Sequence, residues 1–260
     1  MLHCCRVWNF PLHKPVTNLN NPFLSIIIPA HNEEGRLPRT LGKIFEFLKK
    51  QNYTSEVIVV ENGSSDRTLE LAHEFASQHP NVTVLKEEQR GKGNAVRHGM
   101  LMARGEYRFI CDADLSMPIN EIQKFIPPAI SDFDIAIGSR EAPGAIRYNE
   151  PSYRHLGGRA INLAIRLFIL PGLNDTQCGF KCFRAEIAEG IFRQQTLLGW
   201  SFDIENLFIA RRKKLRIKEI PIQWYYDPES KVSAVRDALQ MLGDIFRIHL
   251  NAMRGKYDFS

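Results

Sequence analysis

The feature that most constrains the fold is the segment Tyr107–Pro118, in which a short apolar run ends in two aspartates one residue apart. Tyr107–Cys111 has the aromatic and apolar composition of a buried strand. Asp112 and Asp114 follow where such a strand gives way to a loop. On an extended backbone, residues i and i+2 point to the same side, so both carboxylates can converge on one hard cation. An isolated pair of this kind is more simply explained as an Asx-type turn, so the surrounding segments decide.

Strand-like and helix-like segments alternate along the first half of the chain. The strand-like runs are apolar, and two of them end in the polar segments Pro29–Glu34 and Glu61–Asp66. This alternation predicts parallel βαβ units with right-handed crossovers, in which ligands gather at the carboxyl ends of the strands. A short helix is expected at Ile119–Ile126. The expected strands are Phe23–Ile28, Glu56–Val60, Val82–Leu85, Tyr107–Cys111 and Asp134–Gly138.

Length and composition fit one domain with a sizeable core. The chain has 260 residues, 44% of them hydrophobic, and no Pro-, Gly- or Ser-rich linker divides it. Residues 1–22 have the character of a poorly ordered lead, so the domain is expected at residues 23–254. The five cysteines form neither a disulfide framework nor a C-x-x-C pair, which favours a reducing, cytoplasmic compartment. No stretch approaches ~20 uninterrupted apolar residues, so no membrane-spanning segment is expected.

The net charge of +5 admits nucleic acid, anionic lipid or a phosphorylated substrate as a partner. A nucleic-acid-binding module would interleave clustered cations with exposed aromatics. Here the aromatics lie mostly in predicted strands and helix cores, so no nucleic-acid partner is expected.

The segment Arg90–Asn94 reads RGKGN and opens a predicted helix. Two glycines around Lys92 at a helix N-terminus suit a phosphate. The segment matches neither the P-loop nor the dinucleotide fingerprint, and by itself a flexible loop with a solvated lysine explains it equally well.

Five segments, in this order, resemble the nucleotide-sugar half of inverting family 2 glycosyltransferases with the GT-A fold. They are PAHNEE, VVENGSSDRT, GKGNAV, DADLSMP and IGSR. NDTQCGFKCFR, GWSFDIE and the tripeptide at residues 230–232 are similar to the polyprenyl-phosphate branch, and most to dolichyl-phosphate β-glucosyltransferases. The resemblance implies an α/β domain with a Rossmann-like, mostly parallel sheet flanked by helices, and C-terminal amphipathic helices. Its nucleotide-sugar half is expected at residues 23–140 and its acceptor half at residues 141–254.

The resemblance also implies a donor site. Asp112 and Asp114 would hold Mg²⁺ or Mn²⁺ against the donor diphosphate, which Lys92 would approach. Mannosyl relatives often have glutamine where this chain has Ser116, which weakens the case for a mannosyl donor. The residues expected to bind the nucleotide-sugar are Pro29, Ala30, Asn32, Glu33, Glu61, Asn62, Asp66, Lys92, Asp112 and Ala113.

Charge decides which reaction such a site supports. Breaking the bond to the anomeric carbon leaves negative charge on the diphosphate, which a dication and a lysine stabilise. A phosphate monoester has a second pKa near ~6, so this acceptor is already nucleophilic, whereas a hydroxyl acceptor needs a positioned carboxylate. Asp175, Asp203 and Glu205 are candidates for that base. Our hypothesis is that these carboxylates position the sugar or a cationic neighbour. A helix N-terminal charge is the structural alternative for Asp203. The catalytic candidates are Asp112, Asp114, Asp203 and Asp175.

A phosphate acceptor needs cations, and those expected to bind it are Arg140, Arg154, Lys231 and Arg236. Arg147 is better explained as a solvated surface charge.

A polyprenyl tail needs an apolar surface, and Ala160–Leu173 is the most apolar helical candidate. The last predicted helix repeats Val235, Leu239, Leu242, Phe246 and Leu250 on one face, which buried packing explains more simply than membrane contact. We expect a peripheral protein on the inner, cytoplasmic face of a membrane.

The predicted function is metal-dependent transfer of glucose from UDP-glucose to a polyprenyl phosphate, with inversion at the anomeric carbon. GDP-mannose as donor, or a hydroxyl-bearing acceptor, remains an alternative. A sugar-phosphate nucleotidyltransferase would carry a glycine-rich basic loop where this chain has PAHNEE. The sequence leaves the oligomeric state open.

Overall fold

A mostly parallel sheet organises the computed structural model, which describes residues 21–151, 165–227 and 234–258. Within these residues the large sheet has seven strands in the order β3-β2-β1-β4-β7-β5-β8. Only β7 runs antiparallel to its neighbours, β4 and β5. The mixed α/β class and the five predicted strands are confirmed. The strands are β1 (Leu24–Ala30), β2 (Ser55–Glu61), β3 (Val82–Lys86), β4 (Tyr107–Ile110), β5 (Ile135–Ser139), β7 (Lys181–Arg184) and β8 (Ile217–Pro221).

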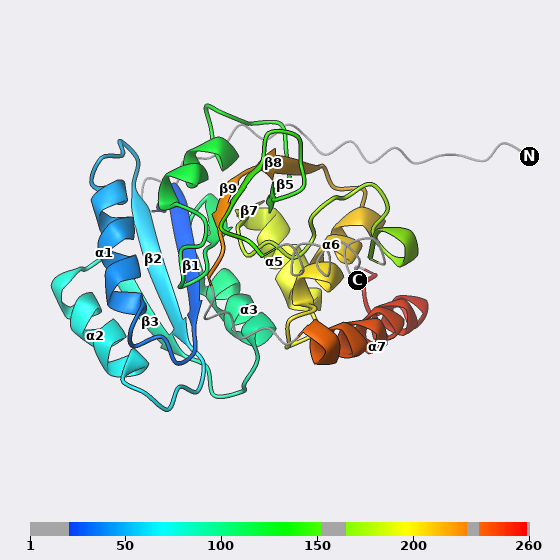
Figure 1. Ribbon diagram of the computed structural model, residues 1–260, viewed down its shortest axis with the longest axis horizontal. Helices are drawn as coiled ribbons and strands as arrows, with labels where there is room; N and C mark the ends of the chain where they lie inside the picture. The colour runs from blue at the N-terminus through cyan, green and yellow to red at the C-terminus, as the bar shows by residue number, and fades with distance from the viewer. Residues whose placement is uncertain (1–20, 152–164, 228–233, 259–260) are drawn as a thin grey trace, which may run out of the picture.

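Helices cover both faces of this sheet (Figure 1). Alternate residues of a strand face opposite sides, so Ile26 and Ile28 pack in the core cluster that includes α1, whereas Ile27 packs with α3. The segment expected as a short helix from Ile119 is a 3₁₀-helix. The first face carries α1 (Leu37–Leu48), α2 (Thr68–Gln78) and η1 (Ile119–Phe125). The second carries α3 (Lys92–Met102), α5 (Ala185–Gln194), α6 (Phe202–Arg212) and α7 (Ala234–Met253).

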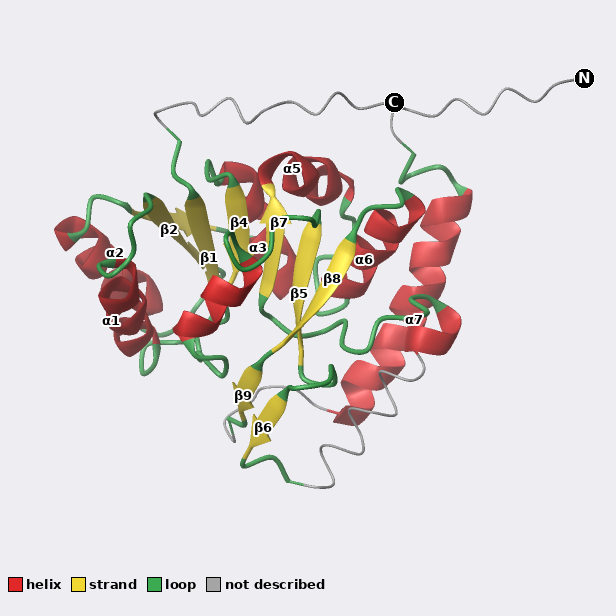
Figure 2. Ribbon diagram, turned by 90° about the horizontal axis from the view of Figure 1, so that it is seen from above, coloured by secondary structure: helices red, strands yellow, loops and turns green. Residues whose placement is uncertain are grey.

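A small two-stranded ribbon lies beyond one end of the large sheet (Figure 2). It pairs β6 (Ile146–Tyr148) with β9 (Gln223–Tyr225) in parallel. The rings of Tyr148 and Tyr225 stack across it with centroids 4.4 Å apart. Because β9 follows β8 after a single residue, the ribbon extends the carboxyl end of the sheet.

Helix α7 presents a different face to the core than the sequence predicted. Leu242 is 54% exposed and Phe246 is 68% exposed, so the prediction that their stripe is buried is wrong. The buried stripe is the neighbouring one, formed by Met241, Ile245 and Ile248. It has the same helical spacing, so periodicity alone could not choose between them. The side chains of residues 235 and 239 lie outside the described part. Among the described residues, no helix has the length and apolar character needed to cross a membrane.

Candidate active site

The loops after β1 and β2 interlock at the carboxyl edge of the sheet. The backbone N–H of Asn32 donates to Ser64 Oγ at 3.0 Å, and the N–H of Ser65 donates to Asn32 Oδ1 at 2.8 Å. Pro29 and Ala30 pair with β2 within the strand register. The parallel register thus brings together the two segments after β1 and β2 that are predicted to bind the nucleotide-sugar.

Glu33 holds an arginine that the sequence reading did not single out. Its carboxylate accepts from Nε and a terminal nitrogen of Arg36 at 2.6 and 2.9 Å, and Arg36 also donates to Asp227 at 2.6 Å. Burial alone lowers the pKa of Arg36, but Glu33, Asp227 and Asp114 raise it overall. Arg36 therefore lies within electrostatic reach of Asp114.

Three further residues predicted to bind the nucleotide also hold the loops in place. Asn62 donates to the carbonyl oxygens of Glu87 and Gln89 at 3.0 and 2.9 Å and accepts from the N–H of Gly91 at 2.8 Å. Buried Glu61 accepts from the N–H of Ser64. Asp66 accepts from the backbone N–H groups of Glu34 and Thr68. These contacts fix the shape of this edge of the sheet.

The two glycines around Lys92 make room for another part of the chain. Gly91 has φ +140°, and a Cβ atom there would collide with the carbonyl of Leu198. A Cβ on Gly93 would crowd the carbonyls of Leu197 and Gly199. The loop before α6 therefore packs directly on the start of α3, which explains the glycines without reference to a phosphate.

Lys92 lies against the first aspartate of the pair. Its Nζ is 2.6 Å from Asp112 Oδ1. Burial alone lowers the pKa of Lys92, but Asp112, with Asp203 and Asp114, raises it. The side chain of Asp114 opens onto solvent, and partial desolvation together with the charge of Asp112 raises its pKa. Two carboxylates are thus gathered with one ammonium group as counter-charge.

This donor set fits a hard divalent cation at an open site. Within residues 21–151, 165–227 and 234–258, no three histidine, cysteine or acidic side chains are gathered as a metal site. The protein therefore supplies two carboxylates, and a diphosphate could supply further oxygens. The backbone of Gly179 lies against the carboxylate of Asp112, so that a Cβ would displace it. The position of Asp112 is thus set by a segment far along the chain.

Lys181 is a functional candidate that the sequence reading missed. Its Nζ lies 2.7 Å from Asp203 Oδ1, and both side chains are buried. Burial raises the pKa of Asp203, opposed by Lys181 and Lys92. A lone lysine in the otherwise apolar segment Gly179–Phe183 was the available signal. Asp203 contacts a cation, as the positioning hypothesis expects.

Glu205 has a structural role. Its fully buried carboxylate accepts from the N–H groups of Thr196 and Leu197 at 2.9 and 2.7 Å and from the hydroxyl of Tyr257 at 2.7 Å. It therefore anchors the loop before α6 and is committed to those donors.

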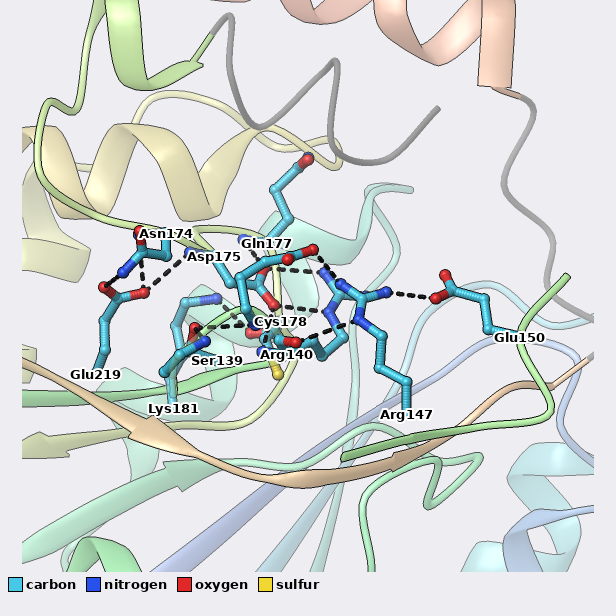
Figure 3. A network of polar contacts seen from close by, with 12 residues as sticks. Ser139, Arg140, Arg147, Glu150, Asn174, Asp175, Gln177, Cys178, Lys181 and Glu219 are labelled. Carbon is cyan, nitrogen blue, oxygen red and sulfur yellow. Dashed lines mark hydrogen bonds and ion pairs between the residues drawn. The ribbon is translucent and has the colours of Figure 1, made fainter. Parts of the chain in front are cut away.

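Arg140 and Asp175 form a bidentate ion pair (Figure 3). Nε and a terminal nitrogen of Arg140 lie 2.7 and 2.9 Å from the two oxygens of Asp175, whose side chain is fully buried. Burial raises the pKa of Asp175, but Arg140 lowers it to about 2, with a smaller contribution from Lys181. Asp175 is therefore a poor base. Glu219 in turn accepts from the backbone N–H groups of Asn174 and Asp175.

Arg147 is not the solvated charge that the sequence suggested. Its guanidinium donates to Glu141 and Glu150 at 2.5 and 2.7 Å and lies over the ring of Trp224, as does that of Arg140. Two acidic partners from nearby turns and an aromatic face make burial of this cation favourable. The sequence did not show that Trp224 would lie beside Arg147, because the pairing of β6 with β9 brings the two residues together.

The other acceptor-site candidates cannot be placed. Arg154 and Lys231 lie outside the described residues, as does the side chain of Arg236. Their assignment stays a prediction.

Charges of alternating sign connect the Lys92–Asp112 pair with the Arg140–Asp175 pair. Lys92 and Asp112 lie on one side, Arg140 and Asp175 on the other, and Lys181 acts on carboxylates of both sides. Such an arrangement can bind two anionic groups near each other, because each side presents a cation held by an aspartate.

Comparison with known proteins places this geometry in context. The family model described as Glycosyl transferase family 2 matches residues 25–192. The dolichyl-phosphate beta-glucosyltransferase of Drosophila melanogaster is 34% identical, over 98% of this chain and 82% of that protein. The proteins of the same name from Saccharomyces cerevisiae and Homo sapiens are 33% and 32% identical, over 90% of this chain and 76% and 77% of their own lengths.

A solved structure agrees in fold. The glucosyl-3-phosphoglycerate synthase from Mycobacterium tuberculosis, in complex with Mn²⁺, UDP-glucose and phosphoglyceric acid, superposes with a TM-score of 0.61 at 16% identity. The match covers 87% of this chain and 79% of that chain. The expected α/β fold of the GT-A type is thereby confirmed.

Proposed function

The chain belongs to glycosyl transferase family 2, and from this membership we propose that it transfers glucose from UDP-glucose to dolichyl phosphate or another polyprenyl phosphate, with inversion at the anomeric carbon. The observation that carries the proposal is the cluster of Lys92, Asp112 and Asp114 at the carboxyl edge of the sheet. It occurs in a chain similar over most of its length to dolichyl-phosphate beta-glucosyltransferases.

The donor side supplies charge for the departing diphosphate. Mg²⁺ or Mn²⁺ bound by Asp112 and Asp114 would act as a Lewis acid on the diphosphate. Lys92 donates to the same leaving group and offsets its developing negative charge. Side chains of the loops after β1 and β2, with Asn32 and Glu33 among them, line the nucleotide pocket in this proposal.

The acceptor side receives the lipid phosphate. Asp175 fixes the plane of the Arg140 guanidinium by occupying two of its nitrogens, which leaves the other edge to be aimed at a phosphate. Arg154, Lys231 and Arg236 complete this site in the proposal. The acceptor phosphate is largely dianionic at neutral pH and attacks without a general base. Asp203 therefore serves to hold Lys181.

We also assign the lipid-facing surface to residues around α7. Exposed apolar side chains lie on α7 and on the segment of residues 167–168. The two segments are in contact, because His249 Nε2 lies 3.3 Å from the carbonyl oxygen of Phe168. Exposed arginines at positions 166, 247 and 254 flank the apolar side chains and suit anionic lipid. Part of the segment predicted to contact the lipid, residues 160–164, lies outside the described residues. We call the exposed apolar side chains of these two segments the apolar surface; they are Leu167, Phe168, Leu242, Phe246 and Met253.

The test is transfer of labelled sugar from UDP-glucose and, in parallel, from GDP-mannose to a polyprenyl phosphate in detergent, with and without a chelator. We expect chelator-sensitive label in the lipid phase from UDP-glucose alone. Label from GDP-mannose alone would overturn the donor assignment. Transfer of the sugar to a soluble acceptor with release of free UDP, and no labelled lipid, would overturn the acceptor assignment.

A further inference from the structure

The loop before α6 carries an indole ring to the edge of the site. Trp200 is 45% exposed, and its ring centroid lies 4.9 Å from Nζ of Lys92. The same ammonium group lies 2.6 Å from Asp112 Oδ1. The ring is therefore separated from the proposed diphosphate position by the width of one lysine head group.

This loop is anchored on both sides. Glu205 accepts from two of its backbone N–H groups, and Gln195 donates to the carbonyl oxygen of Gly93 at 2.8 Å. The N–H of Asn94 donates to the carbonyl oxygen of Leu198 at 3.1 Å. Aromatic rings lose little conformational freedom when a ligand packs on them, and an anchored backbone reduces the cost further. The exposed ring of Trp200 is thus pre-organised for contact.

The chemistry of a nucleotide-sugar places its hexose beside this ring. The hexose is bonded to the terminal phosphate, so a diphosphate at Lys92 and Asp112 would bring the sugar to the side of the site where Trp200 lies. Glucose carries its ring hydroxyls equatorially, which leaves C–H groups on the faces of the ring. Such a face is apolar and suits an indole, whereas the axial hydroxyl of galactose projects from one of the two faces and leaves only the other one apolar.

We propose that Trp200 packs against the glucosyl ring of the bound donor, on the face from which the axial hydroxyl of galactose would project, and so determines the preference for glucose over galactose. The inference rests on the proposed function and deepens it, since it assigns the recognition of the sugar to a residue outside the carboxylate and cation cluster. The proposal assigns no contact between this ring and the nucleotide.

Isothermal titration with UDP, UDP-glucose and UDP-galactose in the presence of Mn²⁺ separates these contributions. For Trp200→Ala we expect UDP-glucose to bind about ten-fold more weakly, while UDP affinity stays within about two-fold. The variant should then bind UDP-glucose and UDP-galactose alike. Trp200→Phe keeps an aromatic face and should retain most of the difference in affinity between UDP-glucose and UDP-galactose. Met102→Ala, which truncates an exposed side chain at the other end of α3, is the matched control and should leave all three affinities unchanged.

The outcomes distinguish the inference from the proposed function. An equal loss of affinity for UDP and UDP-glucose in Trp200→Ala would show a structural role for the ring and overturn the inference. Unchanged affinity for UDP-glucose would overturn it as well, and both results leave glucosyl transfer standing. A wild-type protein that binds neither UDP nor UDP-glucose would overturn the proposed function together with the inference.

Discussion

The proposed donor and acceptor sides each hold a cation against an aspartate, but they are built differently. On the donor side, Lys92 contacts one oxygen of Asp112, beside a second carboxylate that opens onto solvent. On the acceptor side, Arg140 engages both oxygens of the fully buried Asp175. A lysine head group is a point charge that another cation can replace, whereas a planar bidentate pair is fixed in geometry.

The pKa values express the same contrast. Arg140 holds the pKa of Asp175 at about 2 against the opposing effect of burial, so this carboxylate is fully compensated within the protein. On the donor side, desolvation and Asp112 raise the pKa of Asp114, so the negative charge there is only partly compensated. The proposed donor side is therefore suited to take up a cation with its substrate, while the charge of the Arg140–Asp175 pair is already compensated within the protein.

The largest effect is expected on the donor side, for Asp114→Ala. Transfer should fall by about a thousand-fold, because the variant loses one of two carboxylates for the cation that offsets the charge of the leaving group. The free energy of unfolding should change by no more than about 1 kcal/mol, because the side chain is accessible to solvent. Rates of UDP release and urea denaturation measure the two quantities. Full activity in this variant would remove the metal assignment.

On the proposed acceptor side, Asp175→Asn should instead have its main effect on the free energy of unfolding. Losing this carboxylate leaves the Arg140 cation without its counter-charge, which should cost about 3 kcal/mol in the free energy of unfolding at pH 7. The folded pKa of Asp175 is depressed, so its contribution is present above about pH 4 and is lost as the pH falls toward 2. The variant should lack this part of the acid-induced loss of stability.

Asp132→Asn is the matched control, because Asp132 forms an exposed ion pair with Arg216. It should cost less than about 1 kcal/mol in the same urea titrations. Equal costs for the two variants would show that the buried pair at Asp175 is no stronger than a surface pair, and the contrast between the two sides would fail.

The pair between the two sides can be tested by a double-mutant cycle. Lys181→Met and Asp203→Asn each leave a buried charge without its partner, so each should destabilise the fold by about 3 kcal/mol. The double variant removes both charges and should recover about 2 kcal/mol of the summed loss. Denaturation midpoints measure this coupling. Strictly additive losses would show that the 2.7 Å contact contributes nothing to stability.

The convergence of the segments on the proposed donor side could be predicted from the sequence because their signals are local. Each strand ends in its own polar turn, and the spacing of Asp112 and Asp114 is readable without knowledge of the fold. The parallel register then carries these ends to one edge, which the βαβ pattern already implies. What remained hidden was the loop packed against Gly91, because that contact joins segments about a hundred residues apart.

The acceptor side was harder to predict because its partners are distant or ambiguous in the sequence. Nothing in the pattern around Arg147 announces that Trp224, in the ribbon, covers it. The buried pair of Lys181 and Asp203 joins a strand to a helix. On α7, two stripes of equal spacing compete for the core, and only tertiary packing selects the one that includes Met241.

The smallest effect is expected at the apolar surface, and it separates the two sides kinetically. The double variant Leu242→Ser, Phe246→Ser should raise the KM for the polyprenyl phosphate in liposomes by about ten-fold, because two side chains no longer enter the apolar layer. The KM for UDP-glucose should not change, since the donor reaches its site from water.

Met102→Ser, which places the same polar group at an exposed position on α3, controls for a general loss of apolar surface. If the variant instead raised the KM for UDP-glucose, or if Met102→Ser weakened use of the lipid equally, α7 would not be the lipid-facing element, and the two sides would share one route of access from solvent.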